Sequence, residues 1–142
     1  YPFMRCYCSI CRKANGGGGY AINIRGLYPS FSVSGKEQVR RYRVPAERTA
    51  TGEEGLSDTQ RAFCGECGAA LWAYSPEWEP GIYPFASAIN TSLPAPPETV
   101  HIFVTSRPSW VDLPEGENHR FFEEYPEESV REWHENRDLI VD

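Results

Sequence analysis

Five cysteines in two short clusters constrain this chain of 142 residues more than any other feature. Cys6, Cys8 and Cys11 form a Cys-x-Cys-x-x-Cys group, and Cys64 and Cys67 form a Cys-x-x-Cys pair. An odd number of cysteines in two tight clusters is a poor framework for disulfides, whereas closely spaced thiolates readily converge on one metal ion. We therefore predict that these cysteines bind zinc.

The five sulfurs can be divided between zinc ions in two ways. In the first, four of them close a single structural zinc site and one thiol is left over. In the second, Cys6, Cys8 and Cys11 hold a zinc whose fourth position is open to water or a substrate thiol, which is typical of catalytic zinc. Cys64 and Cys67 would then be half of a second, four-cysteine structural site. The spacing alone favours the single site, because it needs no further residues.

Composition favours a mainly β fold. Gly and Pro number 12 each, and aromatic residues make up 13% of the chain. Many turns combined with bulky β-forming side chains are more typical of β domains than of helical bundles. The length fits one compact domain, so we predict a single domain over residues 1–142.

Charge and hydropathy argue against two classes of partner. The chain has 20 acidic and 14 basic residues and a net charge of −6, whereas affinity for nucleic acid depends on clustered Lys and Arg. No segment approaches the roughly 20 apolar residues of a membrane helix, and the first residues do not resemble a signal peptide. We therefore expect a cytoplasmic protein that binds neither nucleic acid nor membrane.

The hydrophobic pattern divides the chain into strands, loops and late helices. Alternation with a period of two, as in Tyr20, Ile22 and Ile24, is typical of half-buried strands. It predicts strands at 20–24, 31–33, 39–44, 59–63, 69–74, 82–86 and 100–105, with a turn at Gly35. Polar, aperiodic residues 45–58 and proline-rich residues 90–98 predict loops, and charge-rich residues 117–124 and 127–136 predict helices.

Three segments of the sequence together resemble a known enzyme family. Residues 6–14 read Cys-Tyr-Cys-Ser-Ile-Cys-Arg-Lys-Ala before a glycine run, and residues 63–71 read Phe-Cys-Gly-Glu-Cys-Gly-Ala-Ala-Leu. Residues 101–104 read His-Ile-Phe-Val and precede Trp110. In this order, over residues 3 to about 125, they resemble the glutathione-dependent formaldehyde-activating (centromere-protein-V-like) family.

The resemblance implies a tent-like, zinc-binding β-sheet fold with two zinc ions per full-length chain. Cys6, Cys8 and Cys11 would bind the catalytic zinc, and Cys64 and Cys67 would bind the structural zinc together with an earlier Cys-x-Cys pair. The family carries that pair on a strand shortly before the present residue 1. We therefore expect that this N-terminal strand is missing from the sequence.

The resemblance also implies an activity. The chain would be a zinc-dependent carbon–sulfur lyase that joins glutathione or another thiol to formaldehyde or another small aldehyde, as S-hydroxymethylglutathione synthase does. One alternative is a non-catalytic zinc scaffold that binds a protein partner. Another is a thiol oxidoreductase similar to the methionine sulfoxide reductases, although no reactive cysteine stands outside the two clusters.

Residues that follow the first cluster are candidates for binding the thiol substrate. Arg12 and Lys13 could bind the carboxylates of glutathione, or they could be solvated charges that offset an anionic zinc site. Gly16 and Gly17 begin a run of four glycines that would let backbone N–H groups approach a peptide-like ligand, or would simply form a flexible turn. His101 lies in an apolar strand, where we expect a hydrogen-bonded core residue and not a metal ligand.

Overall fold

The computed structural model describes residues 2–15, 17–45 and 55–140 of the chain. This part of the chain contains nine strands and two short α-helices, so the prediction of a mainly β fold is confirmed. It comprises two compact units, one of residues 1–24 with 91–142 and the other of residues 25–90. That both belong to one domain stays a prediction.

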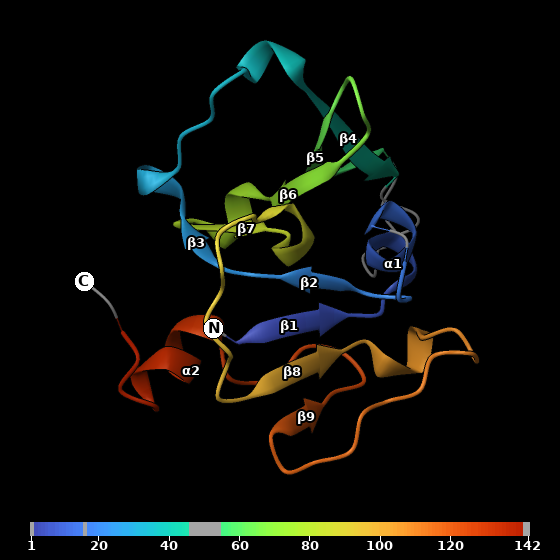
Figure 1. Ribbon diagram of the computed structural model, residues 1–142, viewed down its shortest axis with the longest axis vertical. Helices are drawn as coiled ribbons and strands as arrows, with labels where there is room; N and C mark the ends of the chain where they lie inside the picture. The colour runs from blue at the N-terminus through green and yellow to red at the C-terminus, as the bar shows by residue number, and fades with distance from the viewer. Residues whose placement is uncertain (1, 16, 46–54, 141–142) are drawn as a thin grey trace. The chain divides into compact units, whose positions relative to one another are not determined.

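The first unit is built on a four-stranded sheet in the order β2-β1-β8-β9, shown in Figure 1. β1 runs antiparallel to β2 and parallel to β8, and β8 runs parallel to β9. The elements of this unit are β1 (Phe3–Cys6), α1 (Ser9–Asn15), β2 (Ala21–Asn23), β8 (Thr99–Ile102), a 3₁₀ helix (Val104–Ser106), β9 (His119–Phe121) and α2 (Val130–Glu135).

The register of this sheet separates two sets of side chains. Arg5 of β1 pairs with His101 of β8, which pairs in turn with Phe121 of β9. Cys6 pairs with Ile102 one residue further along. Because successive side chains of a strand point to opposite faces, Cys6 and Ile102 lie on one face and the set containing Arg5 and His101 lies on the other.

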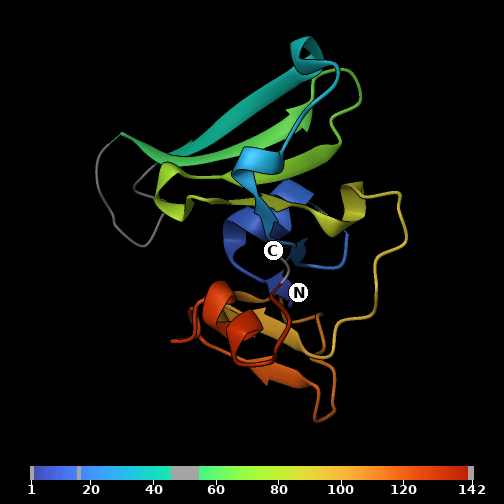
Figure 2. The same ribbon diagram turned by 90° about the vertical axis from the view of Figure 1, so that its left-hand side faces the viewer.

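The C-terminal helix α2 begins where the sequence places a helix-capping motif. The Ser129 hydroxyl accepts the backbone N–H of Glu132, whose carboxylate accepts the N–H of Ser129 in return. α2 lies at the end of the sheet where β1 and β8 begin (Figures 1 and 2). There Trp133 is buried, and its Nε1 donates a hydrogen bond of 2.9 Å to Glu98 just before β8. The predicted helix 127–136 is therefore confirmed in its central residues.

The second unit is a five-stranded antiparallel sheet in the order β3-β7-β6-β5-β4. Its core contains Ala62, Trp72 and Ile82, against which Phe31 and Val33 pack. In Figure 2, β4 and β5 (teal and green) run edge to edge as a long hairpin. The strands are β3 (Gly26–Leu27), β4 (Val39–Pro45), β5 (Leu56–Cys64), β6 (Ala70–Tyr74) and β7 (Gly81–Pro84). The 3₁₀ helices are Tyr28–Ser30, Lys36–Gln38, Pro76–Trp78 and Ala86–Ala88.

Most predicted strands are confirmed, with ends shifted by a few residues. The segments predicted at 20–24, 39–44, 59–63, 69–74 and 82–86 correspond to β2, β4, β5, β6 and β7. The strand predicted at 100–105 ends early as β8, because Phe103 takes a left-handed φ of 57° and a 3₁₀ helix follows. Gly35 has a φ of 70° and forms the predicted turn.

Three predictions of secondary structure are wrong. The segment 31–33 forms no strand, because the 3₁₀ helix at Tyr28–Ser30 precedes it and Phe31 is instead packed edge-on against Trp72, with ring centroids 5.0 Å apart. The segment 117–124 contains β9 and not a helix, because its backbone continues the sheet beside β8. Helix is also not confined to the C-terminal part, since α1 follows the first cysteines.

Two loops were predicted from composition. Residues 90–98 contain no helix or strand, as predicted. The loop predicted at 45–58 falls largely on 46–54, which lie outside the described residues, and its last three residues belong to β5. No helix in the described part of the chain is long and apolar enough to cross a membrane.

Candidate metal centre

The first cysteine cluster forms where the chain leaves the sheet of the first unit and enters α1. Cys6 is the last residue of β1, and the next residue, Tyr7, still donates its N–H to Ile102 O at 3.1 Å. Cys8 lies in a bend beyond the sheet, and Cys11 lies in the first turn of α1. The Arg12 N–H donates to Cys8 O at 3.1 Å, which folds the helix back onto the bend.

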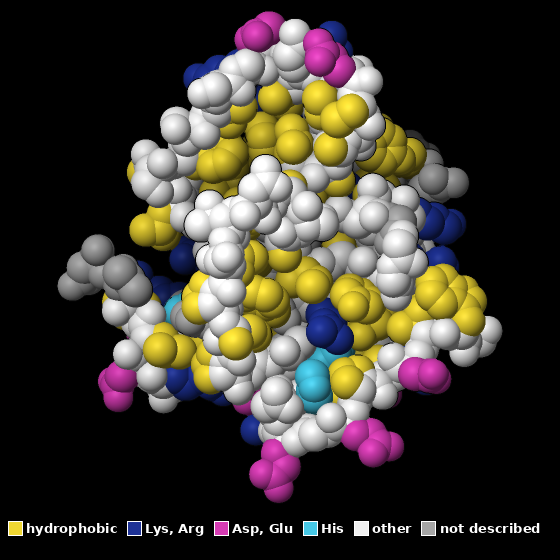
Figure 3. All heavy atoms as spheres, viewed as in Figure 1, with side chains coloured by type: hydrophobic (Ala, Val, Ile, Leu, Met, Phe, Trp, Pro, Cys, Tyr) yellow, Lys and Arg dark blue, Asp and Glu magenta, His cyan; other side chains and the backbone are white. Residues whose placement is uncertain are grey.

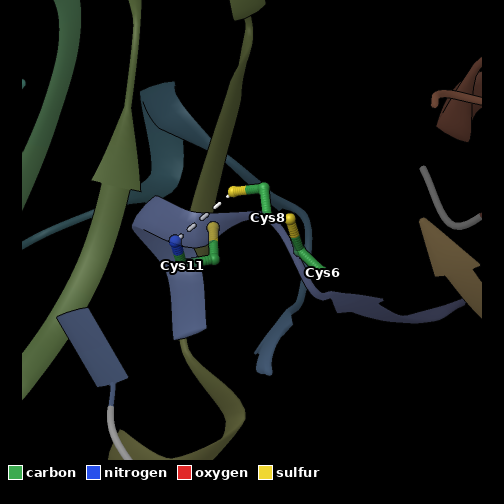
Figure 4. A group of neighbouring side chains, drawn as sticks. All are labelled: Cys6, Cys8 and Cys11. Carbon is green, nitrogen blue, oxygen red and sulfur yellow. Dashed lines mark hydrogen bonds between the residues drawn. The ribbon is translucent and has the colours of Figure 1, made fainter. Parts of the chain in front are cut away.

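These turns bring the three sulfurs together. The Sγ atoms of Cys6, Cys8 and Cys11 all lie within 4.8 Å of one another, and Figure 4 shows them directed toward a common point. Thiolates that bind one tetrahedral zinc at 2.3 Å are about 3.8 Å apart, so small side-chain rotations would complete the geometry. Cys6 and Cys11 are buried and Cys8 is half-buried. The cluster is therefore largely screened from water but accessible at one sulfur.

The electrostatics of the cluster fit a cation. Cys8 Sγ accepts the backbone N–H of Cys11 at 3.4 Å. Hydrogen bonds from the Cys11 and Cys6 side chains lower the pKa of the Cys8 thiol to about 2, and the same sharing of protons, led by Cys11, raises the pKa of Cys6. Cys8 is thus the sulfur of this cluster whose thiolate form the neighbouring thiols stabilise. A metal ion that replaces the thiol protons would turn all three sulfurs into thiolate ligands.

Cys64, the last residue of β5, and Cys67 form a tight turn that leads toward β6 in the second unit. The Cys64 N–H donates to Ala69 O, and Cys64 O accepts the N–H of Gly68, both at 2.9 Å. Gly68 has a left-handed φ of 73°, a conformation that glycine adopts without strain. Backbone N–H groups of Cys67 and Glu66 hydrogen-bond to Cys64 Sγ and lower its pKa. The Cys67 side chain also hydrogen-bonds to that of Cys64, so the two sulfurs lie close together, as half of a four-cysteine zinc site would require.

Comparison with known proteins identifies the family. Residues 2–106 match the model of the glutathione-dependent formaldehyde-activating enzyme family. The chain belongs to this family. A protein of Halomonas elongata, provisionally named as a glutathione-dependent formaldehyde-activating enzyme, is 47% identical to this chain over 135 residues, which cover 94% of this chain and 82% of that protein. The resemblance inferred from the cysteine segments is therefore confirmed.

The matched region of this formaldehyde-activating family member includes all five cysteines and the cationic residues after the first cluster. Arg12 and Lys13 lie in the last turn of α1; Arg12 is half-buried and Lys13 is exposed. The Arg12 Nε is buried and has no hydrogen-bond partner within the described residues. Gly17 is exposed, has a φ of 66°, and has no atom within 4 Å of the position of a Cβ. Gly16 lies outside the described residues.

His101 is a hydrogen-bonded core residue, as predicted. It is completely buried, and the ligand group found within the described residues consists of Cys6, Cys8 and Cys11. Its Nδ1 lies 2.9 Å from the Tyr7 hydroxyl, and its Nε2 lies 3.0 Å from Nδ1 of His119. Burial, with smaller effects of Arg5 and His119, lowers the pKa of His101 to about 4.

Tyr7 and His119 did not emerge as important from the sequence. The sequence did offer one signal for Tyr7, which is its position between two cysteines. Side chains alternate along a strand, so the ring of Tyr7 is expected on the face opposite the Cys6 sulfur. No signal in the sequence points to His119, which reaches His101 only through the pairing of β9 with β8.

Proposed function

We propose that the protein is a zinc-dependent carbon–sulfur lyase that joins glutathione to formaldehyde, giving S-hydroxymethylglutathione, and that cleaves this adduct in the reverse direction. The observation that carries the proposal is the three-sulfur cluster in a chain of the formaldehyde-activating family. The name of the Halomonas relative, which refers to glutathione and formaldehyde, supports the choice of substrates.

Cys6, Cys8 and Cys11 would hold the catalytic zinc. When bound by three thiolates, zinc supplies a Lewis acid with one tetrahedral position for an outside ligand. The structure around the cluster matches this use, because two sulfurs are buried and fixed by β1 and α1 while Cys8 remains partly accessible.

The residues after the cluster would bind the thiol substrate. Zn²⁺ and three thiolates together carry a net charge of about −1, so a fourth sulfur is repelled unless cations lie nearby. Arg12 and Lys13 supply two positive charges in the same short helix as Cys11. The unpartnered Arg12 Nε is available to a carboxylate, and Gly16 and Gly17 would let backbone N–H groups approach the peptide.

The chemistry is a reversible addition. The glutathione thiolate attacks the carbonyl carbon of formaldehyde, a C–S bond forms, and the π-electron pair of the C=O bond moves to oxygen, which takes up a proton. In the reverse direction the hydroxyl gives up its proton, the carbonyl re-forms, and the thiolate leaves. The chain's part in this step is to hold the thiol and aldehyde within reach of each other and to stabilise the anionic sulfur.

Cys64 and Cys67 would bind a second, structural zinc together with two further thiolates. This gives two zinc ions per full-length chain, which elemental analysis of the purified protein can count. A single zinc held by four of the five cysteines would contradict this division.

The activity is tested by measuring the rate of adduct formation and cleavage by the zinc-loaded, full-length protein against the spontaneous reaction. We expect Cys8→Ala to reduce the rate to the spontaneous level with little loss of thermal stability. Cys67→Ala, the matched control, should mainly lower thermal stability, since a structural zinc contributes directly to folding. If the parent protein does not exceed the spontaneous rate although it binds zinc, the lyase proposal fails and a zinc scaffold is favoured.

A further inference from the structure

Three side chains form a continuous hydrogen-bonded chain across the sheet of the first unit. The Tyr7 hydroxyl lies 2.9 Å from Nδ1 of His101, and Nε2 of His101 lies 3.0 Å from Nδ1 of His119. Tyr7 and His101 are completely buried, and His119 is half-buried on the edge strand β9. These hydrogen bonds therefore link His119, at the edge of the sheet, to Tyr7, which lies between Cys6 and Cys8.

Strand register places these three side chains on the face of the sheet opposite Cys6. Arg5 and His101 are paired and share a face, whereas Cys6 is directed to the opposite face. Tyr7 follows Cys6, so its ring lies on the face of His101, and the two rings are stacked with centroids 5.8 Å apart. The three side chains thus cannot bind the metal themselves. They can act only on the backbone that carries its ligands.

The backbone of Tyr7 determines where Cys8 lies relative to Cys6. Its N–H is bound to Ile102 O, and the chain then turns out of the sheet into the bend of Cys8. Any rotation about the φ and ψ angles of Tyr7 would move one sulfur with respect to the other. Fixing the Tyr7 side chain restrains these angles.

The donors and acceptors favour one direction for these hydrogen bonds, from Tyr7 through His101 to His119. With both rings neutral, the Tyr7 O–H donates to Nδ1 of His101, and the Nε2–H of His101 donates to Nδ1 of His119. Every polar group in the chain is then satisfied, and His119 keeps its Nε2–H for the surface. The opposite direction would leave the buried Tyr7 proton in need of another acceptor.

We propose that Tyr7 and His101 are positioning residues of the metal centre, which hold Cys6 and Cys8 at the separation that the metal requires. The inference rests on the proposed metal site. It assigns a role to a buried histidine and a buried tyrosine that take no part in ligation or in binding the substrate.

The surroundings keep this arrangement intact near neutral pH. Burial, with smaller effects of Arg5 on β1 and His119 on β9, holds the pKa of His101 at about 4, so that its Nδ1 remains an acceptor. Tyr20, the residue before β2, packs against Tyr7, with ring centroids 5.3 Å apart. Figure 3 shows a small histidine patch (cyan) at the surface next to a cationic side chain (dark blue), over the strands β1, β8 and β9 of Figure 1.

The first test is the zinc affinity of the full-length protein, measured by competition with a chelator. Tyr7→Phe keeps the buried ring but removes the hydroxyl, and we expect it to weaken zinc binding at the three-cysteine site about tenfold, the lower end of the effect of removing supporting hydrogen bonds. Tyr20→Phe removes a hydroxyl from the neighbouring ring and should leave zinc affinity unchanged. Circular dichroism checks that both variants are folded.

A pair of substitutions at His101 separates positioning from core packing. The amide of Asn can place a polar atom where Nδ1 faces Tyr7, whereas the amide of Gln places one where Nε2 faces His119. His101→Asn should therefore retain zinc affinity within about threefold, and His101→Gln should lose about tenfold, as Tyr7→Phe does. The absorption bands of the cobalt-substituted protein should shift in His101→Gln and not in His101→Asn, because they report the arrangement of the thiolates.

The outcomes are distinguishable. Unchanged zinc affinity in folded Tyr7→Phe, or equal losses in His101→Asn and His101→Gln, would overturn the positioning role while leaving the metal site and the lyase activity standing. If Tyr7→Phe does not fold, the comparison of the two His101 variants decides. A parent protein that binds no metal at its three-cysteine cluster would overturn the metal site, and the positioning role with it.

Discussion

Gly17 and Gly19 offer a matched test of what the glycine run after α1 contributes. Both take left-handed backbone conformations, with φ of 66° and 81°. Their surroundings differ: a Cβ on Gly19 would lie 2.5 Å from Cγ2 of Val111 and 3.1 Å from the ring of Trp110, whereas a Cβ on Gly17 would meet no atom within 4 Å. Substitution by alanine therefore adds the same backbone strain at both positions but a steric clash at only one.

The expected loss of stability follows from these two effects. A left-handed conformation costs a residue with a Cβ about 1–2 kcal/mol, which applies to both substitutions. The clash at Gly19 adds about 1–3 kcal/mol, because the buried, β-branched Val111 has little freedom to move aside. We expect Gly17→Ala to lower the free energy of unfolding by about 1–2 kcal/mol and Gly19→Ala by about 2–5 kcal/mol.

Urea denaturation of the zinc-loaded protein measures both values under the same conditions. Equal losses for the two variants would refute the reasoning, because they would mean that Val111 and Trp110 accommodate the methyl group without cost. Glutathione titration of the same proteins adds a second result. If Gly17 lets the ligand approach, Gly17→Ala should weaken glutathione binding, although it disturbs no contact within the described structure.

Three other predictions concern ionisable groups. Glu98→Ala should lower the free energy of unfolding by about 1–3 kcal/mol in urea denaturation, because the buried Glu98 accepts the Trp133 Nε1–H and pairs with Arg137, which keeps Glu128 as a second partner. Because the pKa of His101 is about 4 when folded and near 6.5 when unfolded, stability should fall as the pH drops through this interval. Urea denaturation should show that His101→Asn removes this part of the pH dependence, and an unchanged slope would contradict it. Arg12→Ala and Lys13→Ala should each weaken glutathione binding by about 0.5–2 kcal/mol in calorimetric titrations, and the effect should shrink at high salt if it is electrostatic.

The grouping of Cys6, Cys8 and Cys11 was predictable because these residues are close in the sequence. A Cys-x-x-Cys spacing brings two sulfurs together through local turns, whatever the rest of the fold does. The path of the backbone was less predictable. No secondary structure was predicted for the first cysteines, whereas a strand ends at Cys6 and a helix of seven residues begins at Ser9. So short a helix has little stability of its own, so local sequence preferences alone could not have predicted it.

The errors elsewhere arise from contacts that are distant in the sequence. Residues 117–124 are rich in charge and resemble an exposed helix, yet the backbone of this segment pairs with β8. The Thr99 N–H donates to Asn118 O at 2.9 Å, and the Phe122 N–H donates to His101 O at 2.8 Å. These bonds join segments about twenty residues apart, and the hydrophobic pattern of either segment alone contains no information about them.

The same kind of distant pairing determines which side chains can influence the candidate metal centre. The match to the family extends to residue 106 and includes Tyr7 and His101, but His119 lies beyond it, on β9. His119 accepts a hydrogen bond from the Nε2–H of His101. This keeps Nδ1 of His101 unprotonated, so that it can accept the hydrogen bond of the Tyr7 hydroxyl. If Tyr7 positions Cys6 and Cys8, a strand outside the matched region can therefore affect metal binding without a contact to any cysteine. Substitutions at position 119 that cannot accept this bond should weaken zinc binding less than Tyr7→Phe, because they act through one further hydrogen bond.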